Sequence, residues 1–439
     1  MQREIQVNEK LPFGPGLLLS LQHLFAMFGS TILVPNLFHV DPGMILLMNG
    51  IGTLLYILIC KGKIPAYLGS SFAFIAPVTG VLDKYGYNSD GYSLVLGAFV
   101  VTGVIFAVVA LIIRFAGTGW LDIVFPPAAM GAIVALIGLE LIPVAAQMAG
   151  LIAPDGADPA SWAPNGKVIA LSMITLAVTL LGAVMFRGFP KIIHILIGIV
   201  VGYVLAFPLG QIDTTAIRDA SLVQFPTLTT PTFDWPVILT IIPVSLVVIV
   251  EHVGHLLVTG NIVGKNLSKD PGLDRSLLGN GISTILSGFV GSTPNTTYGE
   301  NIGVMALTRV YSIFVIGGAA VIAIVLSFSG TFTGAIAAIP GPVMGGVSLL
   351  LFGVIAASGL RILVEQKVDY SKAQNLLLTT VVLVTGLSGA TVTFGTVQLK
   401  GMALATIVGI LLSLFFRLLQ VTGLSNESRE QAPPVKNPD

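Results

Sequence analysis

Long apolar segments dominate this chain and limit what it can fold into. Hydrophobic residues make up 54% of the sequence and charged residues only 10%, whereas a soluble domain has about 25% charged residues. We therefore expect an all-α polytopic membrane protein. A helix needs about 20 apolar residues to cross a bilayer, and twelve segments approach that length: 15–37, 42–60, 92–114, 120–143, 167–187, 190–210, 236–260, 276–290, 310–328, 340–362, 371–389 and 398–420.

Two further segments are apolar enough to enter the membrane but too interrupted to be ordinary helices. Residues 64–80 contain a Gly-Ser-Ser run, and residues 292–307 contain Pro294, two glycines and several hydroxyl and amide side chains. Unpaired polar groups in lipid cost several kcal/mol each, so both segments should line a cavity. With them, the predicted fold has fourteen transmembrane segments, of which the third and tenth are broken.

The charges of the loops predict the orientation. Cytoplasmic loops of membrane proteins are enriched in Lys and Arg. With an even number of spans and the N-terminus inside, both termini are cytoplasmic, and residues 423–439 form a disordered cytoplasmic tail. Of the 21 basic residues, the ones left outside are Lys84, Lys167, Arg218 and Lys400. The formal net charge of zero gives no reason to expect a nucleic-acid partner.

Weak internal similarity indicates a duplicated unit. Three short motifs recur in the same order with offsets that fall along the chain: Leu21–Leu24 with Val250–Val253 at 229 residues, Gly69–Ser71 with Gly291–Thr293 at 222, and Pro126–Gly131 with Pro340–Gly345 at 214. Seven spans separate the copies, so the second copy would be inverted. In transporters built from such 7+7 inverted repeats, the binding site lies between the corresponding broken segments.

Ionisable residues within apolar or broken segments are functional candidates, and we single out three of them, Glu251, His255 and Glu300. Glu300 lies in the second broken segment. Glu251 and His255 are four residues apart in an apolar helix and share one face, and such a pair could exchange a proton. A Glu-His pair that only locks helices together is the alternative. We expect no metal site, since the spacing matches no zinc-peptidase motif and no third ligand is evident.

Two other polar residues within apolar segments are harder to interpret. His23 could be structural or could face the site, and both readings stay open. Glu140 lies near the outer end of its span, where we expect an interfacial role.

The candidate ligand follows from the groups that the two broken segments would offer. The two carboxylates accept hydrogen bonds when ionised and donate one when protonated, and aromatic rings could cover a flat ligand. Together with open backbone, they suit a small planar ring with N–H donors and C=O acceptors, such as an oxidised pyrimidine or purine. The proposed contacts are Glu251, Glu300, Phe72 and Tyr298, with backbone at Ser71, Phe72 and Gly299.

The same two carboxylates predict the coupling ion. Like charges repel strongly at low dielectric, so at least one of the two acids should carry a proton in a neutral site. Proton coupling follows, although coupling to Na+ stays open. No cofactor beyond the coupling ion H+ is expected. We do not expect an enzyme, because no nucleophile and base pair and no metal-binding set appears in the sequence.

The run Glu300–Arg309 resembles the signature motif of the nucleobase/ascorbate transporter family, of the nucleobase cation symporter 2 type. The resemblance covers roughly residues 12–420 and is strongest to its bacterial uracil permease branch. Further segments carry it: Ser20–Gly29, Lys61–Phe74, Glu251–His255 and Gly291–Glu300.

The resemblance implies an architecture. The family has a core domain, here residues 12–117 and 233–330, that moves against a gate domain, here residues 118–232 and 331–422. The short third and tenth segments pair as antiparallel strands with the nucleobase between them. The family is typically homodimeric.

The resemblance also implies roles for single residues. Glu251 and Glu300 would bond the ring, backbone at Phe72 and Gly299 would add contacts, and His255 would take part in proton coupling. Ser30, where an Ala is expected in close relatives, would add a hydroxyl beside the ring.

The predicted function is therefore import of uracil with protons across the bacterial inner membrane by alternating access. Two alternatives stay open. One is a purine carrier of the same fold for xanthine or urate. The other is an anion transporter of the related sulfate-carrier architecture.

Overall fold

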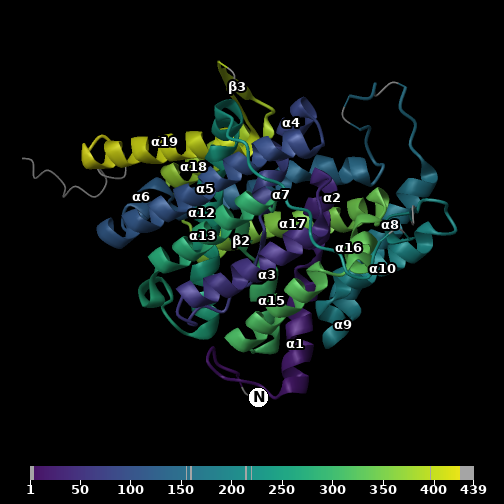
Figure 1. Cartoon of the computed structure of the whole chain (residues 1–439). Coiled ribbons are helices and arrows are strands. Elements are labelled where there is room, and N and C mark those ends of the chain that lie inside the picture. Colours follow the sequence, from purple (N-terminus) through teal and green to yellow (C-terminus); the bar gives the residue numbers. More distant parts are fainter. Residues whose placement is uncertain are drawn as a thin grey trace, which may run out of the picture.

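A computed structural model describes residues 4–154, 156–158, 161–212, 215–218, 220–395 and 397–425. The predicted tail lies almost wholly outside these residues. The first half of the described chain contains the following elements (Figure 1): α1 (Phe13–Ala26), α2 (Phe28–Phe38), α3 (Pro42–Ile59), β1 (Leu68–Ser70), the 3-10 helix η1 (Phe72–Phe74), α4 (Ile75–Tyr85), α5 (Ser89–Ala116), α6 (Leu121–Val124), α7 (Pro127–Met148), α8 (Gly166–Met185), α9 (Phe189–Ile192), α10 (His194–Ala206) and α11 (Thr215–Arg218).

The second half contains α12 (Trp235–Val263), the π-helical turn η2 (Ser268–Gly272), α13 (Leu273–Val290), β2 (Asn295–Thr297), α14 (Gly299–Thr308), α15 (Ile313–Ser327), α16 (Gly330–Ala337), α17 (Gly341–Glu365), α18 (Ala373–Leu387), β3 (Thr391–Phe394), β4 (Val397–Lys400) and α19 (Gly401–Val421).

Among the described residues, eight helices are long and apolar enough to cross a membrane, counting α1 with α2 as one span. The number is nine if α15 and α16, which meet at 89°, are also one span. The shorter apolar helices are α10 and α18. The chain is thus an all-helical multi-pass membrane protein, as its composition predicts.

The two broken segments meet as a pair of short strands. β1 pairs antiparallel with β2, and Gly69 lies opposite Thr296. This confirms the strand pairing that the family resemblance implies. A second antiparallel pair, β3 with β4, was not predicted. The expected span at 398–420 therefore begins as a strand, and its helix starts only at Gly401.

Glycines let two pairs of helices approach one another closely. A side chain at Gly103 of α5 would collide with backbone of α13, and one at Gly281 of α13 would collide with backbone of α5. On the other side of the molecule, Gly138 of α7 and Gly359 of α17 face each other's helices in the same way. Small residues at helix crossings allow the close backbone contact by which membrane helices associate.

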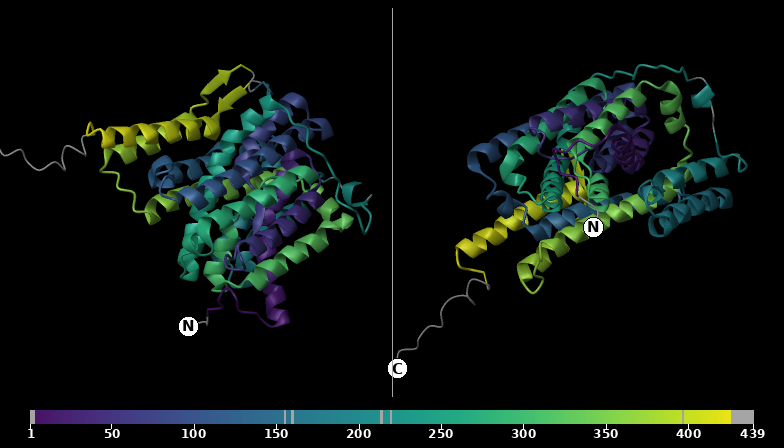
Figure 2. Two further views of the ribbon diagram at one scale, coloured as in Figure 1. Left: turned by 60° about the vertical axis from the view of Figure 1, so that its left-hand side comes forward. Right: turned by 90° about the horizontal axis from the view of Figure 1, so that it is seen from below.

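The helices form two groups. In the first, α5 packs on α13 and α3 packs on α15; in the second, α17 packs on α7 and α8, and α18 packs on α19. Figure 2 shows the second group, including the yellow α19 and light-green α17, as an elongated layer beside the more compact first group. Helix α12 belongs to the first group through α5 but also contacts α7 and α19, so it lies at the boundary.

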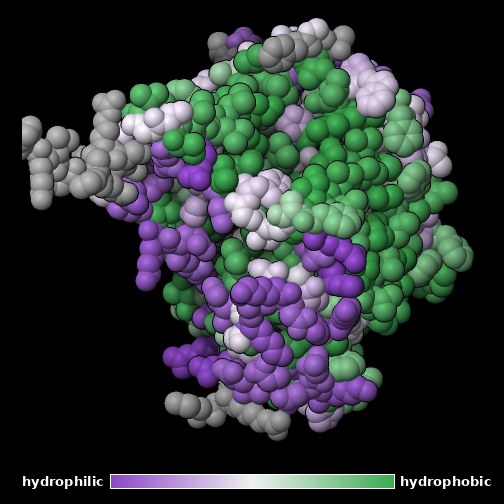
Figure 3. All heavy atoms as spheres, turned by 90° about the vertical axis from the view of Figure 1, so that its left-hand side faces the viewer, coloured by the Kyte–Doolittle hydropathy of each residue, from purple (hydrophilic) through white to green (hydrophobic). Residues whose placement is uncertain are grey.

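Hydrophobic residues cover much of the face shown in Figure 3. Hydrophilic residues gather over the lower part of the face shown, towards the end where the described N-terminal residues lie. Many large apolar side chains are exposed, among them Phe115, Val184 and Leu411 at 79%, 77% and 62%. Exposure of this kind fits a protein surrounded by lipid.

Candidate functional site

Each strand of the first pair leads directly into a helix. β1 is followed by η1, which begins at Phe72, and β2 is followed by Tyr298 and then α14, which begins at Gly299. The first N–H groups of a helix have no partner within it and carry its positive dipole end. Because the strands are antiparallel, these two helix starts lie at the strand pair and run away from it in opposite directions.

Helix α12 brings its ionisable residues to this place. His255 has its Nδ1 at 3.2 Å from the Thr297 hydroxyl at the end of β2. The Nε2 atom of the same ring lies 3.3 Å from where a side chain would begin at Gly299. The carboxylates of Glu251 and Glu300 are close enough to interact electrostatically. The structure therefore brings together the three ionisable residues that the sequence singles out.

A cavity of about 90 Å³ opens beside these residues. Glu251, His255 and Gly299 line it from one group of helices, and Ser358 and Arg361 of α17 line it from the other. The Arg361 Nε donates to Glu365 at 2.6 Å at the rim, where the two side chains are 64% and 35% exposed. The candidate site is thus formed between the two groups of helices.

His252 has a different environment from its two neighbours on α12. It is fully buried, and its Nε2 lies 2.8 Å from the Ser276 hydroxyl of α13. The Tyr56 hydroxyl of α3 lies 2.6 Å from the same oxygen. His252 therefore ties α12 to α13 and α3, as expected for a residue that does not share the face of Glu251.

The two aromatic residues of the predicted site contact each other. The rings of Phe72 and Tyr298 meet edge to face with centroids 6.3 Å apart, and Phe72 also meets Phe352 of α17 at 6.0 Å. The Tyr298 hydroxyl donates to the Ser70 carbonyl and interacts with the Ser30 side chain.

The two predicted site serines are both buried. The Ser30 hydroxyl donates to the Met27 carbonyl at 2.8 Å. The backbone N–H of Ser71 donates a hydrogen bond to the Pro294 carbonyl at 3.0 Å. The expectation that this N–H is open to a ligand is therefore wrong, because the strand pairing extends by one bond. The Ser71 hydroxyl has no hydrogen-bond partner among the described residues.

Two asparagines that the sequence reasoning did not single out hold the site together. The Asn301 amide, next to Glu300, donates to the His23 carbonyl at 3.0 Å and lies 3.1 Å from the His23 ring Nδ1. The Asn295 amide of β2 donates to the Ser283 hydroxyl at 2.6 Å. His23 is 1% exposed, so the structure favours its structural reading. Both asparagines lie in the second broken segment, residues 292–307, and this position is the sequence feature that could have identified them.

A protein-family model described as a permease family matches residues 15–395. The chain belongs to this permease family. The permease is 61% identical over 425 residues to a uracil permease of Paenibacillus larvae, covering 97% of this chain and 99% of that protein. It is 63% identical to a uracil permease of Escherichia coli, covering 96% and 95%. A uracil permease of Bacillus subtilis is 46% identical, with 90% and 91% covered. The resemblance to nucleobase transporters is thereby confirmed.

Solved structures of more distant proteins share the fold of the permease. The murine solute carrier 26 family member A9, an anion transporter in the inward-facing state, matches with a TM-score of 0.72 at 13% identity, covering 94% of this chain and 69% of that one. The transmembrane domain of the cyanobacterial bicarbonate transporter BicA matches at 0.61 and 14% identity, covering 95% and 100%. At such low identity, these matches establish the architecture alone.

Proposed function

We propose that this permease imports uracil together with protons. The main support for this proposal is the pair of carboxylates, Glu251 and Glu300, inside an otherwise apolar protein. They lie beside the strand pair, where two helices begin. This arrangement occurs in a chain that is 61–63% identical over nearly its whole length to proteins named uracil permeases. Uracil offers two N–H donors and two C=O acceptors on one flat ring, which suits these groups.

The binding contacts follow from the chemistry of each group. An ionised carboxylate at Glu251 or Glu300 accepts a ring N–H, and a protonated one donates to a ring carbonyl. The N–H groups of Phe72 and Gly299, at the first positions of η1 and α14, donate to the remaining acceptors. Phe72 and Tyr298 supply apolar contact for the ring.

Two serines complete the proposed site. The Ser71 hydroxyl, which has no partner among the described side chains and backbone groups, is a further donor. The Ser30 hydroxyl, which interacts with Tyr298, adds a further polar group beside the uracil ring.

Proton coupling rests on the same residues. Two carboxylates that share a site of low dielectric do not both stay ionised, so a proton enters the site with the substrate. The His255 imidazole, between Thr297 and Gly299, is the group through which protons exchange with Glu251 one helical turn away. Protons and then uracil bind while the site is open to the outside. The site then becomes open to the cytoplasm, and loss of protons there releases the base.

We further infer a 7+7 inverted repeat of fourteen segments. Nine candidate spans, the short apolar helices α10 and α18, the helix α13 and the two broken segments make up this number. The helix contacts also come in corresponding pairs: α3 with α15 and α13 with α5, α1 with α15 and α12 with α5, α8 with α10 and α18 with α19. Each pair is what exchange of the two halves would produce, and it supports the repeat.

We propose that the first group of helices belongs to a core of residues 12–117 and 233–330, and the second to a gate of residues 118–232 and 331–422. Movement of the core against the gate would alternate access to the site. The distribution of basic residues supports cytoplasmic termini and insertion in the bacterial inner membrane. We also propose that the permease is a homodimer, as the family resemblance implies.

Uptake of labelled uracil into proteoliposomes tests this function. We expect saturable uptake that unlabelled uracil abolishes and that xanthine, urate, sulfate and bicarbonate leave unchanged. Strong competition by xanthine or urate would favour the purine alternative. Anion flux without uracil uptake would favour the anion transporter and would contradict the proposal.

A further inference from the structure

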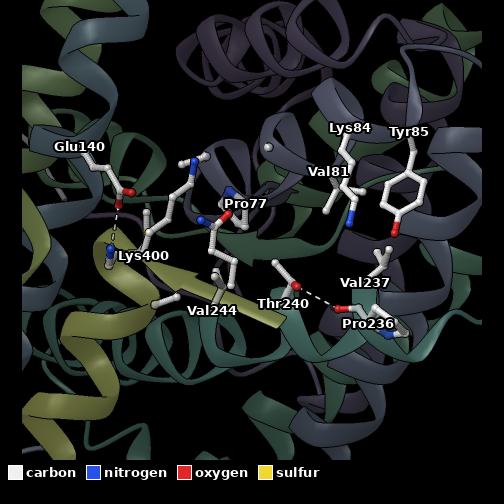
Figure 4. A pocket seen from close by; sticks show the side chains of 15 residues that line it. Pro77, Val81, Lys84, Tyr85, Glu140, Pro236, Val237, Thr240, Val244 and Lys400 are labelled. Atoms are coloured by element: carbon white, nitrogen blue, oxygen red, sulfur yellow. Dashed lines mark hydrogen bonds between the residues drawn. The ribbon is translucent and has the colours of Figure 1, made fainter. Parts of the chain in front are cut away.

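A second polar cavity lies at the other end of the boundary between the two groups of helices (Figure 4). Its volume is about 130 Å³. Helices α4 and α12 form one part of its wall, and α7, β4 and the start of α19 form the other. Figure 4 shows Glu140 and Lys400 on one side of this outer cavity and Lys84 and Tyr85 on the other. None of these four residues takes part in the site proposed above.

The carboxylate of Glu140 is fixed at the edge of the outer cavity. Its Oε2 accepts a hydrogen bond from the Met402 N–H at 2.9 Å, at the start of α19. Gly401 has a positive φ of 55°, and the carboxylate occupies the space where a side chain at that position would lie. Only glycine fits this position without strain.

The cations of the outer cavity come from both groups of helices. The Lys400 ammonium reaches across the boundary and lies 3.7 Å from where a side chain would begin at Gly80 of α4. The Lys84 ammonium lies over the Tyr85 ring at 5.0 Å. The outer cavity therefore offers two donors and a carboxylate acceptor around an aromatic residue.

One face of α12 connects the outer cavity with the candidate site. Thr240 and Val244 line the outer cavity, and Glu251, His255 and Val258 line the cavity of the candidate site. The spacings of four, seven, four and three residues put all five on one side of a helix. Thr240 and Glu251 are about 16 Å apart along the axis at 1.5 Å per residue. The buried residues Val247 and Val248 lie between them.

We propose that the outer cavity is a second binding site, a vestibule that captures uracil or a similar planar imide ring before it reaches the central site. The Lys84 and Lys400 ammonium groups donate to the ring carbonyls, and Glu140 accepts a ring N–H. Tyr85 offers a flat surface to the ring. The ligand then moves along the α12 face to Glu251. This inference rests on the proposed function, because the ligand is the proposed substrate.

Uptake from the two faces of the membrane separates the vestibule from the central site. The double variant Lys84→Gln/Lys400→Gln should raise the KM for uracil entry into right-side-out vesicles at least about tenfold, the size expected for lost charge-assisted hydrogen bonds. The KM in inside-out vesicles, and the Kd of uracil for purified protein, should stay within about twofold. The control Lys167→Gln removes an exposed lysine at the start of α8 and should change neither KM.

A second variant tests the same site without removing a charge. Gly80→Val adds bulk to the outer cavity, and the nearest atom is the flexible end of Lys400, so the fold should accept it. We expect the same rise of the KM for uracil entry from the outer face. Lys84→Arg/Lys400→Arg should retain the low KM of the unmodified permease.

The vestibule proposal would be wrong if the KM for entry from the outer face were unchanged in both variants. It would also be wrong if the KM rose equally for entry from both faces of the membrane. The proposed function would survive either result. Absence of uracil uptake by the unmodified permease would contradict the proposed function itself.

Discussion

The phenol ring of Tyr298, the residue after β2, packs on Gly69 of β1 and occupies the space that any side chain at position 69 would need. The Tyr298 hydroxyl donates to Ser70, the next residue of β1. Glycine at position 69 therefore sets how closely the two broken segments approach. The geometry of the proposed uracil site depends on that approach.

Substitution of Gly69 should displace the Tyr298 ring and disturb the site. We expect Gly69→Val to lower the initial rate of uracil uptake at least about tenfold, because a shift of 1 Å can cost a site a large part of its activity. Tyr298→Phe keeps the ring and loses one hydrogen bond, so about a fivefold loss is expected. Equal uptake by Gly69→Val and the unmodified permease would show that this contact does not matter.

The two central carboxylates should be individually indispensable. Glu251→Gln and Glu300→Gln preserve shape but remove the ability to change charge, so each should abolish proton-coupled uracil uptake. The control Asp122→Asn changes an exposed carboxylate of α6 and should leave uptake unchanged. Full activity of both glutamine variants would remove these residues from the site.

Substitutions of His252 and of His255 should have different effects on stability and transport. His252→Ala removes the bond to Ser276 within a buried network, so we expect a loss of about 1–3 kcal/mol in stability with uracil affinity retained. His255→Asn should leave thermal stability nearly unchanged and alter the pH profile of uptake. Thermal melting and uptake measured between pH 5 and 8 distinguish the two. The reverse pattern would contradict the assignment of the two residues.

Asn301 should act as a positioning residue for Glu300. Asn301→Ala removes the donor that joins α14 to the His23 carbonyl of α1. We expect a KM increase of about fivefold for uracil with a smaller change in maximal rate. Asn301→Asp keeps the size but places a carboxyl group in a buried position next to Glu300, so the KM should rise at least as much as in the alanine variant. An unaltered KM in both variants would show that the tie between α1 and α14 does not position Glu300.

Much of this arrangement could be predicted from local sequence. Glu251 and His255 share a helix face because they are four residues apart, and the interrupted segments had to leave the lipid. The motif pair that begins with Pro126 and Pro340 also corresponds in the structure, where these residues precede α7 and α17.

Other features required knowledge of contacts between distant segments. The match of Gly69 with Gly291 does not coincide with the strands, since β2 begins four residues beyond Gly291. The bond from Ser71 to Pro294 and the tie between Asn301 and His23 join residues more than 200 positions apart. Neither periodicity nor motif spacing carries that information.

Movement of protons with uracil tests the central claim most directly. Purified permease is reconstituted into proteoliposomes that contain a pH-sensitive dye, and uracil is added outside with no imposed gradient. We predict acidification of the lumen that depends on uracil, is absent with Glu251→Gln and Glu300→Gln, and becomes slower as the outside pH is raised. Uracil uptake with no change of internal pH, or uptake that needs Na+ and ignores pH, would contradict it.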